Sequence, residues 1–155
     1  MKERAWVGID PGQSGAVAVI FRAGQIVEDW PGCPARAAEL LLNWRIEFNV
    51  ELAALESVHA MPGQGVKSMF AFGRNLGAWE GLLAALHVGY VMPTPQQWQK
   101  GLVMPSDGAD PKARSLTVAR RLFPDADLSR KKDHGRADAL SWAWWARRQG
   151  GDQWP

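Results

Sequence analysis

The chain has 155 residues, which fits one domain of ordinary size. Hydrophobic residues make up 46% of it, enough to bury a core, and Cys33 is the only cysteine. A single thiol excludes an internal disulfide or a thiolate-rich zinc site and indicates a reducing compartment. No apolar run approaches the roughly 18–20 residues of a membrane helix. We therefore expect a cytoplasmic protein with no membrane partner.

The net charge of +2 is unevenly distributed along the chain. Residues 112–148 contain ten Lys or Arg against four Asp or Glu, which is near +6, whereas the rest of the chain is slightly acidic. A basic segment on an acidic body indicates a polyanionic partner.

The first half of the chain reads as strands followed by a helix. Ala5–Asp10 is an apolar run that ends on a carboxylate, and turn residues at 11–15 separate it from a second apolar run, Ala16–Phe21. These two runs predict a β-hairpin. We further expect a strand over 25–30, a helix over 35–48 on the spacing of Ala38, Leu41, Leu42 and Arg45, and a buried strand over 51–56.

An apolar seam at alternating steps of three and four predicts a helix over 67–87. Beside the seam, Gly73, Gly77 and Gly81 recur every four residues. Because a helix-interior glycine costs up to about 1 kcal/mol relative to alanine, this row indicates that another backbone approaches closely. We favour tight packing on the domain's own sheet, with a helix–helix dimer seam as the alternative. The seam consists of Met69, Phe72, Leu76, Trp79, Leu83 and Leu86.

The second half predicts a strand over 88–93, a helical turn over 95–101, and helices over 111–123 and 134–148. Strands first, then strands alternating with helices, predict one α/β domain over 1–150 with a mixed five-stranded sheet flanked by helices. Residues 151–155 read as a frayed tail. We expect Trp98 to anchor the core, with base stacking as the alternative, and at least one of Trp142, Trp144 and Trp145 to be buried.

Three acidic residues lie in or next to apolar segments, where burial of a charged side chain is unfavourable unless the charge has a function. Asp10 and Glu56 follow apolar strands, and Asp138 lies in a small, apolar stretch of the last helix. If the three converge, their like charges resist ionisation unless a cation neutralises them, and hard oxygen ligands suit Mg²⁺ or Mn²⁺. Two such ions can clamp a phosphodiester for in-line hydrolysis. Taken singly, Asp10 could cap its turn, Glu56 could pair with an arginine, and Asp138 could face solvent.

Three segments, in this order, resemble motifs of the RuvC family of Holliday-junction resolvases. Gly8–Ala16 resembles the opening motif of that family, Leu55–Val58 with the helix after it resembles the second acidic strand, and His134–Leu140 resembles the C-terminal acidic motif. The matches spread over residues 6–146 and are most similar to the short, phage-type members. Such a protein would act near a nucleoid or be encoded by a phage in a bacterial host.

This resemblance implies a ribonuclease H-like fold and a homodimer whose two sites cut symmetrically related strands of a four-way DNA junction. It also implies hydrolysis that depends on Mg²⁺, two ions per site, with Mn²⁺ as a substitute. By position, Asp10, Glu56 and Asp138 would be catalytic metal ligands. The family's fourth ligand stands three residues before the last Asp, where this chain has Gly135. His134 shares a helix face with Asp138 and could take that role, with Asp133 as the competitor.

Further residues could contact branched DNA, because a site that cuts DNA needs nearby cations to hold the phosphate backbone. Lys112 and Arg114 resemble the basic residues with which resolvases grip the backbone, and His59 stands where the resemblance places an aromatic side chain. The alternative for each basic residue is a solvated charged face. The remaining candidates are Gln64, Lys67, Arg130, Lys131, Lys132 and Arg136.

The leading hypothesis is therefore a Mg²⁺-dependent endonuclease for Holliday junctions. One alternative is a nuclease that prefers flaps or forks. The other is a junction-binding protein that does not cut, which the glycine at position 135 keeps open. The chain has one domain's length and no second Gly-rich phosphate loop, so we expect no nucleotide cofactor.

Overall fold

The computed structural model describes residues 1–57 and 62–150 and contains one mixed five-stranded sheet in the order β3-β2-β1-β4-β5. Its strands are β1 (Glu3–Asp10), β2 (Ala16–Phe21), β3 (Gly24–Asp29), β4 (Phe48–Leu55) and β5 (Tyr90–Val91). The predicted hairpin is confirmed, since β1 pairs antiparallel with β2 and Asp10 lies opposite Ala16. The parallel neighbour of β1 is β4, which begins three residues earlier than expected.

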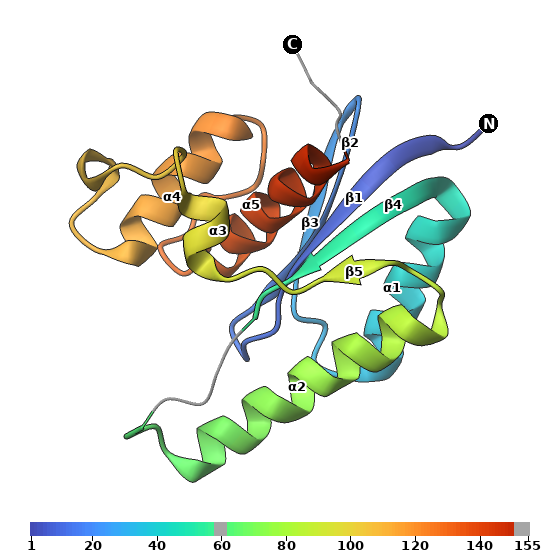
Figure 1. The fold of residues 1–155 in the computed structure, drawn as a ribbon, viewed down its shortest axis with the longest axis horizontal. Coiled ribbons are helices and arrows are strands. Elements are labelled where there is room, and N and C mark those ends of the chain that lie inside the picture. Colours follow the sequence, from blue (N-terminus) through green and yellow to red (C-terminus); the bar gives the residue numbers. More distant parts are fainter. Residues whose placement is uncertain (58–61, 151–155) are drawn as a thin grey trace.

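Helices cover both faces of this sheet (Figure 1). One face carries α1 (Pro34–Glu47) and α2 (Val66–Ala85), and the other carries α3 (Pro95–Gln99), α4 (Pro111–Leu122) and α5 (His134–Gln149). A short 3₁₀ turn, Pro105–Asp107, precedes α4. The predicted mixed five-stranded α/β architecture is thus confirmed. No helix in the described ranges combines the length and apolarity that crossing a membrane requires.

The helix α5 lies directly on β1 because β1 offers a glycine at the point of contact. A Cβ placed on Gly8 would collide with the backbone of Ala139 and Ala143 and would lie 2.9 Å from the Cβ of Trp142. Real Cβ contacts essentially never fall under 3.0 Å. Gly8 therefore sets how closely α5 approaches the sheet.

Tryptophan side chains fill the space around this contact. Trp142 is fully buried, and its ring meets that of Trp98 edge to face at 5.7 Å between centroids. The prediction of Trp98 as a core anchor is confirmed, and so is the burial of one tryptophan of the last helix.

The helices predicted over 35–48 and 67–87 are confirmed as α1 and α2, but only part of each apolar pattern is buried. The helix α1 buries Ala37, Leu41 and Trp44, whereas Leu42 is 43% exposed. Leu42 and Arg45 fit the helical period that predicted this helix, but both lie on its exposed side. In α2, Trp79 and Leu83 are buried, but the first turns of the helix extend past the sheet (Figure 1).

The glycine row of α2 does not pack on the domain's own sheet, so that preferred interpretation is wrong. Gly73, Gly77 and Gly81 are exposed, and a Cβ added to any of them would meet nothing within 4 Å among the described residues. Beside them, Phe70 is 73% exposed. The alternative, a seam that another chain covers, remains open.

Candidate active site

The acidic residues of the two central strands lie side by side at one edge of the sheet. In β1 and β4 the side chains alternate between the two faces, and Trp6, Gly8 and Ala54 face α5. Asp10 and Glu56 continue this alternation, so both point to the α5 face. The backbone N–H of Glu56 donates to the carbonyl of Ile9 at 3.2 Å, which extends the parallel pairing to the acids themselves.

The third carboxylate comes from α5. Asp138 lies in the second turn of the helix, on the side that meets β1 and α4, and the hydroxyl of Ser115 in α4 donates to its Oδ1. Asp138 is therefore not solvent-facing. Asp10 does stabilise its turn, because its Oδ1 accepts from the N–H of Gly12 at 3.0 Å. Glu56 has no arginine partner in the described part of the chain.

The electrostatics show that these carboxylates affect one another. Burial and, to a smaller extent, the charges of Asp10 and Asp138 together raise the pKa of Glu56 to about 8. Burial also raises the pKa of Asp138 to about 7, together with the charge of Asp10 and against the opposing effects of Ser115 and Lys112. The pKa of Asp10 is likewise raised by burial, although Gly12 and His134 oppose the shift. Buried carboxyl groups that lie close together with few positive charges beside them are suited to binding a cation.

The arrangement is not a closed metal cage. Within residues 1–57 and 62–150, no group of three or more His, Cys, Asp or Glu is placed to hold a metal ion. Mg²⁺, however, commonly binds through one or two carboxylates, several waters and substrate phosphates rather than through an all-protein cage. The hard oxygen donors present at this edge fit such an ion.

The first turn of α5 explains the glycine at position 135. A Cβ on Gly135 would collide with the carbonyl oxygen of Ser14 and lie 3.2 Å from the Cα of Gly15. The turn after β1 thus occupies the space that a fourth ligand would need there. His134, one residue earlier, is half-buried and close enough to Asp10 for its charge to lower the pKa of that carboxyl.

Asp133, the competing candidate for the fourth ligand, is engaged in other contacts. Its side chain is fully buried and does not cap α5. Instead it accepts from the backbone N–H of Arg130 at 2.7 Å and from the guanidinium Nε of Arg130 at 2.7 Å. Burial raises its pKa, but these bonds outweigh burial and leave the pKa below its usual value. A carboxylate so engaged is not available as the fourth ligand, and His134 stays the predicted candidate for that role.

Two of the predicted DNA-binding arginines are engaged in the same ion-pair network. Arg130 pairs with Asp29 at 3.0 Å as well as with Asp133. Arg136 pairs with Asp29 at 2.7 Å and with Asp127 at 3.1 Å. These bonds tie the start of α5 to the end of β3. They favour a structural role for both arginines over contact with phosphate.

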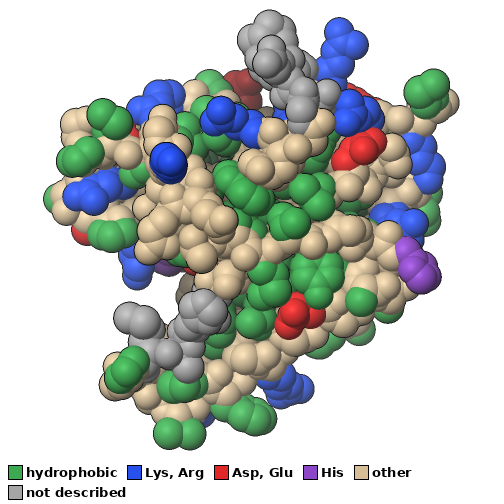
Figure 2. All heavy atoms as spheres, in the orientation of Figure 1, with side chains coloured by type: hydrophobic (Ala, Val, Ile, Leu, Met, Phe, Trp, Pro, Cys, Tyr) green, Lys and Arg blue, Asp and Glu red, His purple; other side chains and the backbone are tan. Residues whose placement is uncertain are grey.

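The remaining basic candidates lie on the surface around α4 and the connector before α5. Lys112, Lys131 and Lys132 are exposed, and the charge of Lys112 reaches Asp138. Arg114 donates to the carbonyl of Gly108 at 2.8 Å, which holds the loop before α4. Lys and Arg side chains are visible over this side of the molecule, and others lie on the opposite side near the N-terminus (Figure 2).

Two further candidates stand at the start of α2. Lys67 is exposed in the first turn of that helix, and Gln64 is exposed two residues before the helix begins. The predicted contact residue His59 lies outside the described residues.

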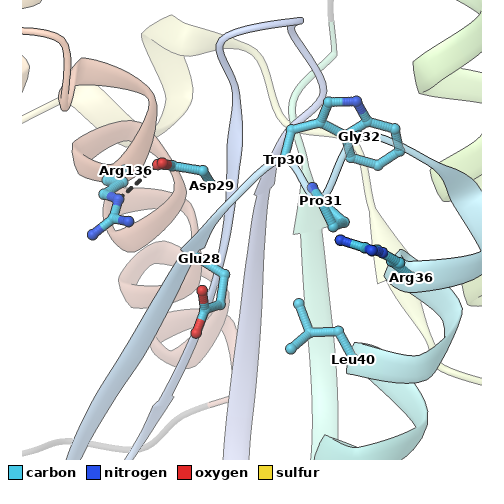
Figure 3. A pocket seen from close by; sticks show the side chains of 8 residues that line it. All are labelled: Glu28, Asp29, Trp30, Pro31, Gly32, Arg36, Leu40 and Arg136. Carbon is cyan, nitrogen blue, oxygen red and sulfur yellow. Dashed lines mark hydrogen bonds and ion pairs between the residues drawn. The ribbon is translucent and has the colours of Figure 1, made fainter.

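A pocket of about 400 Å³ lies at the end of β3, next to the acidic edge but toward α1. Figure 3 shows Arg36 and Leu40 of α1 on one side and Asp29, bonded to Arg136, on the other. Glu28 and Asp29 balance the two arginines, so the pocket has no net charge to attract a phosphate. We assign it no function.

Comparison with known proteins places this geometry in a fold class. No model of a known protein family matches the chain. The solved structure of Thermus thermophilus RuvC superposes with a TM-score of 0.62 at 20% identity, covering 95% of this chain and 96% of that one. The T. thermophilus RuvC in complex with a Holliday junction substrate gives 0.61 at 19%, covering 90% of each chain. The chain therefore has the RuvC-like, ribonuclease H-like fold that its motifs predicted.

A shorter match is found in sequence. A segment of 88 residues, 56% of the chain, is 38% identical to the chloroplastic Holliday junction resolvase MOC1 of Chlamydomonas reinhardtii. The match spans 10% of the length of that protein. The similarity thus covers a stretch of sequence and not the whole relative.

Sequence reasoning missed Ser115 and Asp29. A serine in an amphipathic helix carries no signal of its own, and Asp29 meets arginines about a hundred residues later in the chain. Only the packing of α4 and α5 on the sheet brings these groups together.

Proposed function

We propose that residues 1–150 form a single nuclease domain of the RuvC family that resolves four-way DNA junctions by hydrolysing phosphodiester bonds. The observation that supports this most is the meeting of Asp10, Glu56 and Asp138 at one edge of a RuvC-like sheet, each contributed by a different element. The resemblance to the short, phage-type members and the cellular location stay predictions.

In this proposal Asp10, Glu56, Asp138 and His134 hold divalent cations, Mg²⁺ or Mn²⁺, two per site. Such ions, when bound, activate water and stabilise the leaving oxygen at phosphorus. The chain's own contribution is placement. The β1–β4 pairing fixes Asp10 and Glu56, and the contact of α5 with Gly8 fixes Asp138. The apolar layers around them exclude water and strengthen each electrostatic contact.

Lysine and arginine side chains beside the acids would hold the DNA backbone. Lys112 and Arg114 open α4 next to Asp138, while Lys131 and Lys132 precede α5. Such contacts position the strand without reading its sequence. Gln64 and Lys67 at the start of α2 would meet the junction from the other side.

We further propose a homodimer, since symmetric cleavage of a four-way junction needs two sites. The exposed glycine row of α2 would allow the helix of a second copy to approach closely, and Phe70 beside it would be covered.

One other function is favoured by a specific observation. Gly135 replaces the fourth ligand of the family, and no group of three ligands is preformed among the described residues. A protein that binds junctions without cutting them would show both features. A nuclease for flaps or forks would share the proposed site and differ only in substrate.

Incubation of the protein with a labelled four-way junction, a flap and a plain duplex in Mg²⁺ or Mn²⁺ separates these functions. We expect paired nicks in the junction alone, and we expect Asp10→Asn and Asp138→Asn to abolish cutting while junction affinity is kept. Tight junction binding without products would favour the non-cutting protein. Products from the flap alone would favour the other nuclease, and wild-type cutting by either variant would reject the ligand assignment.

A further inference from the structure

The hydroxyl of Ser115 is the one side-chain donor to Asp138 within residues 1–57 and 62–150. Ser115 lies in the middle of α4, is 5% exposed, and donates to Oδ1 of Asp138 in α5. It is one of three polar or charged residues that are buried in the described structure, together with Asp133 and Ser141. A serine hydroxyl has one hydrogen, so this bond uses its whole capacity as a donor.

The bond divides the two oxygens of the Asp138 carboxylate between different roles. Oδ1 is held by Ser115, whereas Oδ2 has no hydrogen-bond partner in the described part of the chain. A carboxylate attached at one oxygen can no longer rotate freely. Holding Oδ1 therefore limits the directions that Oδ2 can take, and the carboxylate lies close enough to Asp10 and Glu56 for their charges to interact.

We propose that Ser115 is a positioning residue that fixes the Asp138 carboxylate and leaves Oδ2 to bind the divalent cation. This inference rests on the metal site of the proposed function and adds a residue from α4 to it. Lys112 lies one turn before Ser115, on the same face of the helix, and its charge also reaches Asp138. The helix that would hold the DNA backbone is thus the helix that orients a metal ligand.

Hydrogen-bonding partners of metal ligands contribute to affinity, and their removal typically weakens metal binding by about 10–100-fold. We therefore expect Ser115→Ala to raise the Kd for Mn²⁺ by at least about tenfold, as measured by calorimetry on the full chain without DNA. Ser115→Thr keeps the hydroxyl and should restore most of the affinity. Thr117→Ala is the matched control, because Thr117 is exposed and its hydroxyl donates to the carbonyl of Ala113 one turn earlier in the same helix.

In cleavage assays, the Ser115→Ala variant should need more Mn²⁺ for half-maximal rate and should approach the wild-type rate at saturation. Circular dichroism must show that each variant is folded. An unchanged Kd in Ser115→Ala, or an equal loss in Ser115→Thr, would overturn the positioning role. If the wild type binds Mn²⁺ with the predicted dependence on Ser115 but cuts no junction, the inference stands and the proposed nuclease activity fails.

Discussion

Replacing Gly8 by alanine tests whether the approach of α5 to β1 builds the acidic site. The new Cβ would lie 2.9 Å from the Cβ of Trp142 and closer still to the backbone of Ala139 and Ala143. Ordinary contact begins near 3.4 Å, so α5 would have to retreat by more than about 0.5 Å. Backbone atoms cannot rotate aside as a side-chain end can. The helix itself must move, and Asp138 moves with it.

The substitution Gly8→Ala lowers the free energy of unfolding because it overpacks a dense core. Such insertions cost about 1–3 kcal/mol, and collisions with backbone belong at the upper end. Alanine also reduces the conformational entropy of the unfolded chain, which stabilises the folded protein by about 0.4–1 kcal/mol. A net loss of about 2 kcal/mol should lower the melting temperature by at least about 4 °C in a chain of this size. Because a misplacement of about 1 Å can reduce a rate about 100-fold, junction cleavage by the folded fraction should fall similarly.

Gly89→Ala is the matched control for Gly8→Ala. Nothing among the described residues lies within 4 Å of the added Cβ, and Gly89 directly precedes β5, outside the glycine row proposed for the dimer. Alanine should therefore leave the stability unchanged or raise it by about 0.4–1 kcal/mol, because it restricts the unfolded chain. Thermal unfolding followed by circular dichroism measures both variants. Equal melting temperatures for Gly8→Ala and the wild type, with full cleavage activity, would refute the close contact.

Three further predictions concern titration, the fourth ligand and the dimer. Because the pKa of Glu56 is raised from 4.5 to about 8, the folded protein in EDTA keeps a proton that the unfolded chain releases, so its melting temperature should fall between about pH 4.5 and 8. Glu56→Gln should flatten this dependence, and an identical slope in both proteins would contradict the assignment. Asp133→Asn should lower the free energy of unfolding by about 1–3 kcal/mol while Mn²⁺ binding is retained. His134→Ala should keep the stability of the wild type and lose most of the cleavage rate. The reverse pattern would return the ligand role to Asp133. Gly77→Arg should convert a dimer to a monomer in analytical ultracentrifugation, and an unchanged sedimentation coefficient would reject the α2 seam.

The elements of this fold were predictable wherever local chemistry decides them. The hairpin over β1 and β2 follows from two apolar runs around a turn, and Asp110 begins α4 by accepting from the N–H of Ala113. The acidic edge was also predictable, since Asp10 and Glu56 end apolar strands. What failed were features that depend on which neighbour is present. Leu42 fits the helical period of α1 but faces solvent, and the glycine row of α2 has no neighbour within 4 Å in the described part of the chain.

Interactions between distant segments could not be read from the sequence. The role of Asp133 depends on Arg130 and its second partner, Asp29, which is about a hundred residues away in the chain. The glycine at position 135 looked like a missing ligand. In the structure it is where α5 meets the carbonyl of Ser14, a contact that no spacing rule predicts.

The central claim is that acids from β1, β4 and α5 bind divalent cations at one site. Crystals of the protein soaked in Mn²⁺ and measured at the manganese absorption edge test it directly. We predict an anomalous peak within about 2–2.5 Å of an oxygen of Asp10 and of at least one of Glu56 and Asp138. A crystal that shows its manganese only elsewhere, at a concentration that supports cleavage in solution, would contradict the claim.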